Sequence, residues 1–456
     1  MANFLGTFVS FVIVFFIVTF VHEFGHFFMA KLFGIRVEVF SFGIGPRLFG
    51  IKNGVFSFFR LKDETLGTDY RLSPIPLICY VKLHGEGMFE PERPVAPDDM
   101  MAKTRGQRLL VMAMGPVMNI VLAVVLVAVI NGVGVPVPVY LDEKPVIGWI
   151  DKDSPAAHVG LRTGDEILRI NERAVNSWSD VEIAVGSRPD KTIRLAILRG
   201  GSPAEVEVQT ESVGGYSFGY AGFRARTLTQ VQMVLPNSPA EKAGLLPDDV
   251  ILAVDGEPLY FYQFIQVVER SAEKELEFTV RRRGETIIVP VTPRREGNVG
   301  KIGIRQSAES VLKKYGVVKA VGQSVKENTR NVFLIVRFIR DLFTGEASTR
   351  QLGGPQEIAN LSYIALRMGW LAMISWIAFL SLQLGVINLF LPIPIVDGPQ
   401  IVVLVLESIF RRDVSLKFRT IYTYIGYVLI FALMIFVILN DFVKRLPHGW
   451  GSLLPF

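Results

Sequence analysis

Cysteine, histidine and concentrated positive charge are all scarce in this chain of 456 residues. It has one cysteine, Cys79, and five histidines. A single cysteine excludes an intrachain disulfide and leaves the redox compartment open. Lys and Arg outnumber Asp and Glu by only 48 to 43, and they form no dense basic tract. We therefore attribute the net charge of +5 to residues that flank membrane helices, and we expect no nucleic-acid partner.

Hydrophobic residues are abundant in the chain. Half of its residues are hydrophobic, which is too many for an ordinary soluble protein of this length. Four segments are long and apolar enough to cross a hydrocarbon layer of about 30 Å. They lie near 4–30, 108–131, 363–391 and 422–440. The first has no basic stretch before it and no small-residue cleavage site before Lys31, so we interpret it as a retained membrane helix.

Basic residues flank these segments unequally. No Lys or Arg precedes the first segment, whereas Lys31 and Arg36 follow it closely. The loop between the third and fourth segments contains Arg411, Arg412, Lys417 and Arg419. The positive-inside rule then places 32–107 and 408–420 in the cytoplasm, and both termini with the long segment 132–360 outside.

The connector at 311–360 is also basic, but long translocated segments largely escape the charge rule. Its stretch "NVFLIVRFIRDLF" (331–343) mixes apolar and basic residues. This stretch either lies along the membrane surface as an amphipathic helix or forms a soluble helix that packs on its neighbours.

The middle of the chain contains an internal repeat. "SPAAHVGLRTGDEILRINERAV" (154–175) aligns without gaps to "SPAEKAGLLPDDVILAVDGEPL" (238–259), and each copy is followed by an alternating segment typical of hairpin strands. This spacing indicates two duplicated globular domains. The pattern resembles PDZ domains of the circularly permuted bacterial type over 146–224 and 228–306. The resemblance implies that both domains bind extended peptides or chain ends by strand addition, with 218–223 and 301–304 as the candidate carboxylate-binding loops.

Two of the five histidines lie inside the first apolar segment, in "HEFGH" (22–26). On a helix, His22 and His26 project from one face at a separation suited to sharing a metal ion. Glu23 faces the same pocket and can take a proton from a water on that metal. The alternative is a pair of buried histidines whose hydrogen bonds are satisfied by neighbouring helices. An ionisable trio inside a membrane span is costly without a function, which favours the metal site.

A catalytic zinc needs a third protein ligand and one open position. The other three histidines lie outside the apolar segments. A carboxylate is the other common ligand, and "NLFLPIPIVDGP" (388–399) offers Asp397 after Pro392 and Pro394 have broken the helix. Irregular backbone at membrane depth is tolerated only where it lines an enclosed or watery cavity. The alternative is a plain turn at the membrane surface.

The segments "VFSFFRL" (55–61) and "TDYRLS" (68–73) have strand-like composition and are bounded by turn signals. They predict a β-hairpin on the cytoplasmic side. This hairpin is either associated with the membrane, where it can hold an extended substrate, or soluble and without a catalytic role.

These features together resemble the site-2 protease family of intramembrane zinc metalloproteases, in particular the bacterial regulator-of-sigma-E type with two PDZ domains. The matching pieces occur in the family order: "HEFGH" (22–26), "FSFGIGP" (40–46), "MGPVMN" (114–119), the two repeats, "LGGP" (352–355) and "LPIPIVDG" (391–398). The resemblance implies one zinc ion, bound by His22, His26 and Asp397. It also implies that Glu23 is the general base and that Asn119 and Asn388 help to position the substrate.

The sequence departs from the family pattern at three places. Ile78 and Cys79 stand where the family usually has two glycines, and Pro399 and Gln400 replace a Gly-His pair. Asn388 lies one residue further from the aspartate than in the family pattern. None of these departures removes a predicted metal ligand or the predicted base.

The predicted fold is a multi-pass α-helical membrane protein with about four transmembrane helices, a membrane-associated β-hairpin region and two tandem circularly permuted PDZ domains. The predicted boundaries are 1–34 for the first helix, 35–106 for the hairpin region, 107–132 for the second helix, 146–224 and 228–306 for the PDZ domains, 311–360 for the connector, 363–407 for the third helix with its aspartate, and 422–443 for the fourth. The resemblance places the protein in a bacterial inner membrane, with both termini and the PDZ domains on the periplasmic face.

The predicted function is hydrolysis of a peptide bond within the transmembrane segment of single-pass membrane proteins, such as anti-sigma factors, after prior trimming. One alternative is a protease that processes signal-peptide remnants or lipoprotein-derived peptides. Another is an inactive membrane scaffold whose PDZ domains bind envelope proteins, which would not need an intact metal-binding set. The predicted partners are single-pass membrane proteins, peptides or C-termini at the PDZ domains, and membrane lipid.

Overall fold

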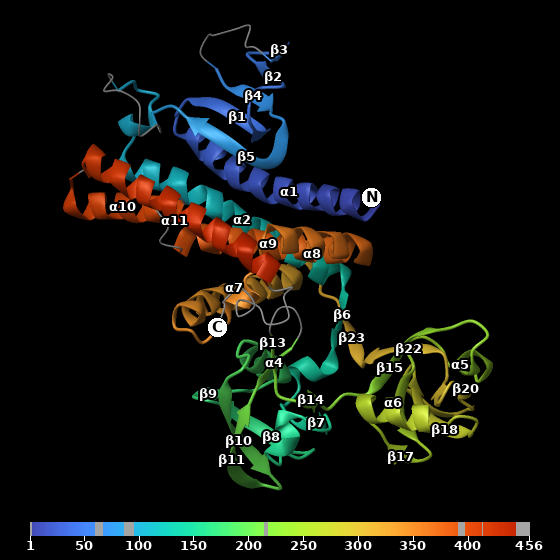
Figure 1. The fold of residues 1–456 in the computed structure, drawn as a ribbon. Coiled ribbons are helices and arrows are strands. Elements are labelled where there is room, and N and C mark those ends of the chain that lie inside the picture. Colours follow the sequence, from blue (N-terminus) through green and yellow to red (C-terminus); the bar gives the residue numbers. More distant parts are fainter. Residues whose placement is uncertain are drawn as a thin grey trace. The chain divides into compact units, whose positions relative to one another are not determined.

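The computed structural model describes residues 2–59, 67–85, 95–213, 218–390, 397–412 and 414–443 (Figure 1). The chain divides into two compact units, each of which is described separately below. The first, the membrane unit, comprises Met1–Val133, Lys314–Phe343 and Leu352–Phe456. The second, the repeat unit, comprises Gly134–Lys313 and Thr344–Gln351. Pro392 and Pro394, which the sequence predicts to break the third helix, lie outside the described residues.

Helices make up most of the described part of the membrane unit. They are α1 (Ala2–Leu32), α2 (Arg105–Val133), α7 (Val317–Phe343), α8 (Pro355–Met368), α9 (Trp370–Phe390), α10 (Asp397–Phe410) and α11 (Leu416–Val443). Among the described residues, four stretches are long and apolar enough to span a membrane: Phe4–Leu32, Arg105–Val133, Trp370–Phe390 and Thr420–Asp441. The prediction of about four helices that are long and apolar enough to span a membrane is therefore confirmed for the described residues.

The third predicted segment is divided in the structure. Helix α8 ends at Met368, and Gly369 has a φ of 111°, a backbone conformation that favours glycine. Helix α9 then begins at Trp370, and the aspartate that was assigned to the end of the same helix starts a separate helix, α10. The helix bearing the predicted third ligand is therefore independent of the spanning helix before it.

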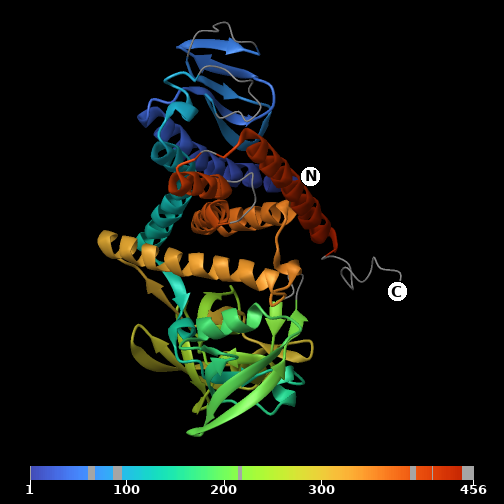
Figure 2. The same ribbon diagram turned by 90° about the vertical axis from the view of Figure 1, so that its left-hand side faces the viewer.

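Helix α2 packs against α1, α9 and α10 (Figures 1 and 2). Two glycines allow its neighbours to approach closely. A Cβ added at Gly25 of α1 would lie 2.4 Å from the carbonyl oxygen of Met114, and one added at Gly385 of α9 would lie 2.9 Å from that of Pro116. Such small residues let membrane helices approach backbone to backbone, which brings groups on α1, α2 and α9 within contact distance of one another.

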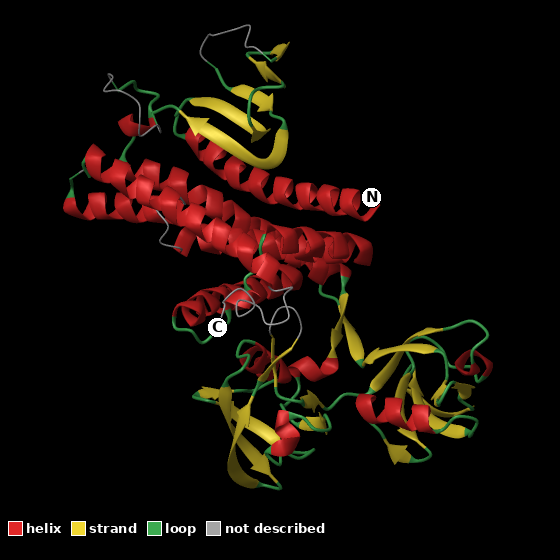
Figure 3. Ribbon diagram, viewed as in Figure 1, coloured by secondary structure: helices red, strands yellow, loops and turns green. Residues whose placement is uncertain are grey.

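A five-stranded sheet follows α1 in the chain and lies beside it (Figure 3). Its strands are β1 (Val37–Ile44), β2 (Phe49–Lys52), β3 (Val55–Phe58), β4 (Asp69–Leu72) and β5 (Ile75–Leu83), in the order β3-β2-β4-β1-β5. The two predicted strands form as β3 and β4, but they do not pair with each other, because β2 lies between them and pairs with both. Strand β5 lies at one edge of the sheet and contacts α1, and β3 lies at the other edge.

The repeat unit contains two modules, named here the first module (146–224) and the second module (228–306). The strands of the first are β7 (Ile147–Ile150), β8 (Glu166–Ile170), β9 (Arg173–Ala174), β10 (Thr192–Arg199), β11 (Ser202–Gln209), β12 (Glu211–Val213), β13 (Phe218–Tyr220) and β14 (Phe223–Ala225), with helices α3 (Pro155–His158) and α4 (Trp178–Gly186). Its main sheet has the order β11-β10-β8-β9, and β14 pairs with β7.

The strands of the second module are β15 (Thr229–Val234), β16 (Val250–Val254), β17 (Glu257–Pro258), β18 (Leu276–Arg282), β19 (Glu285–Val291), β20 (Arg294–Glu296), β21 (Val299–Lys301) and β22 (Ile304–Ala308), with helices α5 (Pro239–Lys242) and α6 (Phe261–Arg270). The main sheet has the order β19-β18-β16-β15-β22. Strands β6 (Val135–Pro138) and β23 (Ser310–Lys313) pair with each other and flank the two modules in the sequence.

The repeated Ser-Pro-Ala motif has the same structural role in both modules. Ser154 is the N-cap of α3 and Ser238 the N-cap of α5, and each side chain accepts a hydrogen bond from a backbone N–H three residues later. The following proline occupies the first helical turn, where its missing N–H costs nothing. The sequence repeat is therefore a repeat of local structure.

Candidate metal centre

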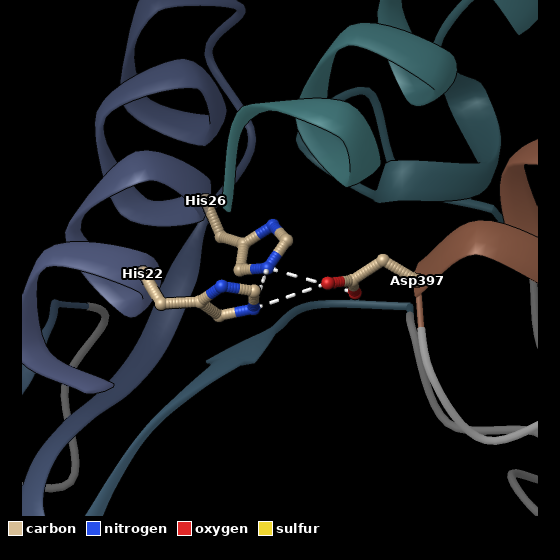
Figure 4. Close-up of side chains that lie close together, drawn as sticks. All are labelled: His22, His26 and Asp397. Atoms are coloured by element: carbon tan, nitrogen blue, oxygen red, sulfur yellow. Dashed lines mark hydrogen bonds and ion pairs between the residues drawn. The ribbon is translucent and has the colours of Figure 1, made fainter. Parts of the chain in front are cut away.

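Three side chains converge inside the membrane unit (Figure 4). His22 and His26 lie one turn apart on α1, and Asp397 is the first residue of α10. Nε2 of His22 lies 3.1 Å from Asp397 Oδ2, Nε2 of His26 lies 3.6 Å from Asp397 Oδ1, and the two Nε2 atoms are 3.3 Å apart. The structure thus brings together the two histidines and the carboxylate that the sequence singles out as metal ligands.

These distances fit the donor set of a zinc site. Zinc binds histidine nitrogen and carboxylate oxygen at about 2.0–2.2 Å, so ligand atoms at the corners of a tetrahedron lie roughly 3.3–3.6 Å apart. The three observed separations bracket that range, and all three ligand atoms lie within 4.8 Å of one another. Three protein ligands leave a fourth position open, which is the arrangement of catalytic zinc sites.

The rings are oriented by groups on α2. Nδ1 of His26 lies 2.8 Å from the carbonyl oxygen of Val111, to which it can only donate, so its Nε2 is left as a ligand. Nδ1 of His22 lies 3.2 Å from Nδ2 of Asn119, while Oδ1 of this fully buried asparagine has no hydrogen-bond partner among the described residues. A half-turn of the Asn119 amide lets Oδ1 accept from Nδ1–H and leaves His22 Nε2 for a metal.

Gly115 keeps the centre open. A Cβ at this position of α2 would lie 2.3 Å from Nε2 of His26 and 2.9 Å from Nε2 of His22. Any other residue would fill the space that the ligand atoms share. The sequence motif that contains Gly115 was recognised, but no role was assigned to this glycine, because only the close approach of α2 to α1 gives it one.

Glu23 and the three ligands line one cavity of about 300 Å³. The backbone N–H of Val81, on edge strand β5, donates to Oε2 of Glu23 across 3.0 Å. The remaining described lining residues are Tyr80, Val81, Leu83, Met112, Asn388 and Gln400. Sequence reasoning missed the backbone group of Val81, since a main-chain donor has no signature in the residue types.

The two asparagines assigned to the substrate occupy different places. Asn388 lines the cavity, with Nδ2 3.5 Å from Nε2 of His22. Asn119 is not among the described residues that line the cavity. Its side chain instead contacts Nδ1 of His22, the ring nitrogen that is not directed at Asp397. Asn388 therefore faces the cavity, whereas Asn119 contacts the ring of a predicted metal ligand.

Known proteins are similar to this chain over nearly its whole length. The model of peptidase family M50 matches residues 10–433. A protein of Pasteurella multocida that carries a zinc-metalloprotease name is 30% identical over 97% of this chain and 100% of its own. The regulator of sigma-E protease RseP of Escherichia coli is 29% identical over the same shares. A solved PDZ domain, from the SdrC-like protein of Listeria monocytogenes, covers 20% of this chain and 93% of its own at 21% identity, but its TM-score of 0.17 supports no conclusion about fold.

The chain therefore belongs to peptidase family M50 and is a zinc metalloprotease of the site-2 protease type.

Proposed function

We propose that this protein hydrolyses a peptide bond within the transmembrane segment of single-pass membrane proteins, such as anti-sigma factors, after another protease has trimmed them. The observation that supports this most directly is the position of the cluster. His22, Glu23 and His26 lie within the apolar stretch Phe4–Leu32, which is long enough to span a membrane. A hydrolytic centre at that depth meets peptide bonds that are themselves within the bilayer.

One zinc ion is held by His22, His26 and Asp397 in this proposal. When bound, zinc supplies Lewis-acid chemistry, because it lowers the pKa of water toward about 7 and polarises a carbonyl group. Glu23 takes the proton from the attacking water and returns it to the leaving amine. Asn388 lies at the wall of the same cavity, where its amide can donate a hydrogen bond to the substrate.

The substrate must be unwound to react, since each unpaired backbone group costs several kcal/mol in lipid. Edge strand β5 offers backbone groups for an extended peptide. Two of its N–H groups are already bonded to α1: Cys79 N–H donates to Thr19 Oγ1 at 3.3 Å, and Val81 N–H donates to Glu23. An extended substrate that reaches the centre therefore competes with Glu23 for the Val81 N–H, and its arrival releases the carboxylate toward the water.

The two modules are PDZ domains of the circularly permuted type in this proposal. In the first module, the predicted carboxylate-binding loop at 218–223 lies beside α4 and lines a cavity of about 280 Å³. Gly222 has a φ of 87°, and a Cβ there would lie 2.1 Å from the Cβ of Ser154, so the loop conformation requires glycine. A loop with backbone N–H groups at the end of a cavity suits a peptide C-terminus.

We place the modules and both termini on the periplasmic face of a bacterial inner membrane, as the basic loops indicate. There the modules act as a sieve that admits only trimmed substrates. Deleting 146–306 should then permit cleavage of an untrimmed substrate that the full-length protein ignores. A deleted protein that keeps its zinc and cuts neither substrate would instead show that the modules recruit substrates.

If the protein cleaves transmembrane segments, its uncleaved substrates should accumulate in cells that carry an inactive variant. Membrane peptides are compared by mass spectrometry between wild-type cells and cells that carry Glu23→Gln, with Glu172→Gln on the exposed surface of the first module as a matched control. Trimmed transmembrane stubs of single-pass proteins should accumulate only with Glu23→Gln. Accumulation of signal-peptide remnants or lipoprotein-derived peptides alone would support the alternative protease function, and no accumulation at all would support the scaffold.

A further inference from the structure

A second cavity, of about 370 Å³, lies next to the metal centre between α1, α8 and α9. Eight of its thirteen described lining residues are apolar, among them Val14 and Val18 of α1, Leu384 and Ile387 of α9, and Ile78 of β5. No lysine or arginine is among the described lining residues, and Glu23 is its one carboxylate. Apolar groups are therefore favoured here, and an acidic group would meet the negative charge of Glu23.

This cavity borders the metal centre. His22, Glu23 and Asn388 line both cavities. All three predicted metal ligands line the first cavity, and mostly apolar residues line the second. A peptide bond placed at Glu23 and His22 therefore has the apolar cavity within reach of a neighbouring side chain. A cavity of about 150 Å³ lined by apolar residues is large enough for benzene, so 370 Å³ accommodates a side chain as large as that of Phe.

Strand β5 connects the two cavities. Ile78 lines the apolar cavity, and Tyr80 lines the metal cavity. Side chains two residues apart in a strand point to the same face and lie roughly 6.6 Å apart along it. An extended substrate that follows β5 thus passes from one cavity to the other over about two residues.

We propose that the apolar cavity is the specificity pocket of this protease, and that it receives one aliphatic or aromatic side chain from a residue adjacent to the scissile bond. This deepens the proposed function and rests on it. Ile78 is the residue that sets the size of the pocket entrance. Its side chain is 45% exposed, so it borders the opening and can be exchanged with little effect on the core.

The test uses the full-length protein with zinc bound, reconstituted in lipid, and a single-pass peptide whose cleaved bond is first mapped by mass spectrometry. Each residue flanking that bond is then changed in turn to Leu, Phe, Ala or Asp. At one of these positions, kcat/KM should be about 10- to 100-fold higher for Leu or Phe than for Ala, and Asp should be cleaved least.

Two variants change the pocket, and a third serves as control. Ile78→Trp should lower kcat/KM for the Leu and Phe substrates about 10-fold or more, and should lower it less for the Ala substrate. Ile78→Gly should extend cleavage to a Trp substrate. Ile75→Trp is the matched control, because Ile75 lies on the same strand, is 50% exposed and is not among the described residues that line the cavity. It should keep the wild-type preference.

The outcomes separate this inference from the proposed function. A wild-type protein that binds zinc but cleaves no membrane peptide overturns both. Cleavage without any side-chain preference overturns the pocket alone. The pocket is also overturned if the wild-type side-chain preference stays the same in Ile78→Trp, Ile78→Gly and Ile75→Trp. In that case the cavity holds a lipid acyl chain only.

Discussion

The backbone N–H of Val81 donates a hydrogen bond to Oε2 of Glu23, with 3.0 Å between nitrogen and oxygen. This bond joins strand β5, at one edge of the five-stranded sheet, to the helix that bears both histidines. It holds the carboxylate on the wall of the cavity that contains the metal ligands. The sheet is therefore part of the catalytic centre in this account, as well as a surface for the substrate.

Asn119 is expected to govern zinc affinity. Asn119→Ala removes the side-chain amide that contacts Nδ1 of His22. Loss of such a partner of a metal-binding histidine typically weakens metal binding about 10- to 100-fold. Asn119→Asp can still accept from Nδ1–H and should retain most of the affinity. Competition with a chelator on the purified protein measures both. Asn131→Ala is the control, because this asparagine is also buried on α2 but bonds to Glu327 instead. Equal affinity in Asn119→Ala and Asn131→Ala would contradict the orienting role.

Removal of the third ligand should remove the metal. Asp397→Ala leaves two histidines, which is fewer than a stable catalytic zinc site requires. The zinc content of the purified variant should fall well below one ion per chain. Asp441→Ala is a matched control, since Asp441 is also a buried carboxylate of the membrane unit but accepts from the N–H of Gly354 at 2.9 Å. Normal zinc content in Asp397→Ala would exclude this residue as a ligand.

The fold could be predicted from the sequence where the determining interactions are local. Four apolar segments predict four helices of spanning length, and the repeat of 154–175 at 238–259 predicts two modules of similar local structure. The break at Gly369 and the position of β2 between β3 and β4 were not predicted. The first depends on the conformation of a single glycine, and the second on pairing between strands that are not neighbours in the sequence.

The candidate site shows the same division. His22 and His26 are related by one helical turn, so their spacing was sufficient to place them together. Asp397 is distant in the chain, and it was reached through ligand chemistry and family resemblance. Gly115 and the backbone groups of Val111 and Val81 had no signal in the residue types, because their roles arise from the packing of α2 and β5 against α1.

The first module should lose part of its stability in acid. Burial alone would raise the pKa of the Asp165 carboxyl, but hydrogen bonds from Arg199 Nε and Nη2, at 2.8 and 2.7 Å, lower this pKa below its usual value. A lowered folded-state pKa means that the stabilisation is complete above about pH 4 and is lost as the pH falls through the folded-state value.

Asp165→Asn tests this pH dependence. The variant should lower the free energy of unfolding of the first module by about 2 kcal/mol at pH 7, and the difference should shrink below pH 4. Hydrogen exchange of the β8 and β10 amides in the full-length protein measures it. Asp249→Asn should also destabilise the second module at pH 7, because it weakens the hydrogen bond that Arg282 Nε donates to Asp249 at 2.7 Å. An equal difference at pH 7 and pH 3 would show that the Arg199 pair does not set the stability.

The orientation derived from the basic loops can be tested with single cysteines. With Cys79 replaced by Ala, Ser202→Cys places a thiol on the exposed surface of the first module, and Ser415→Cys places one in the loop before α11. A membrane-impermeant thiol reagent should label the first in intact spheroplasts and the second only after lysis. The reverse labelling pattern would overturn the proposed periplasmic position of the modules.

Glu23 is expected to perform the proton transfer at a zinc ion that other residues hold. Zinc content and the cleavage rate of a transmembrane peptide, determined on the same preparation of Glu23→Gln, test this role most directly. We expect one zinc per chain, as in the wild type, and a rate lower by about 10²- to 10⁴-fold. Cleavage at the wild-type rate with zinc retained would contradict the role of Glu23 as the general base.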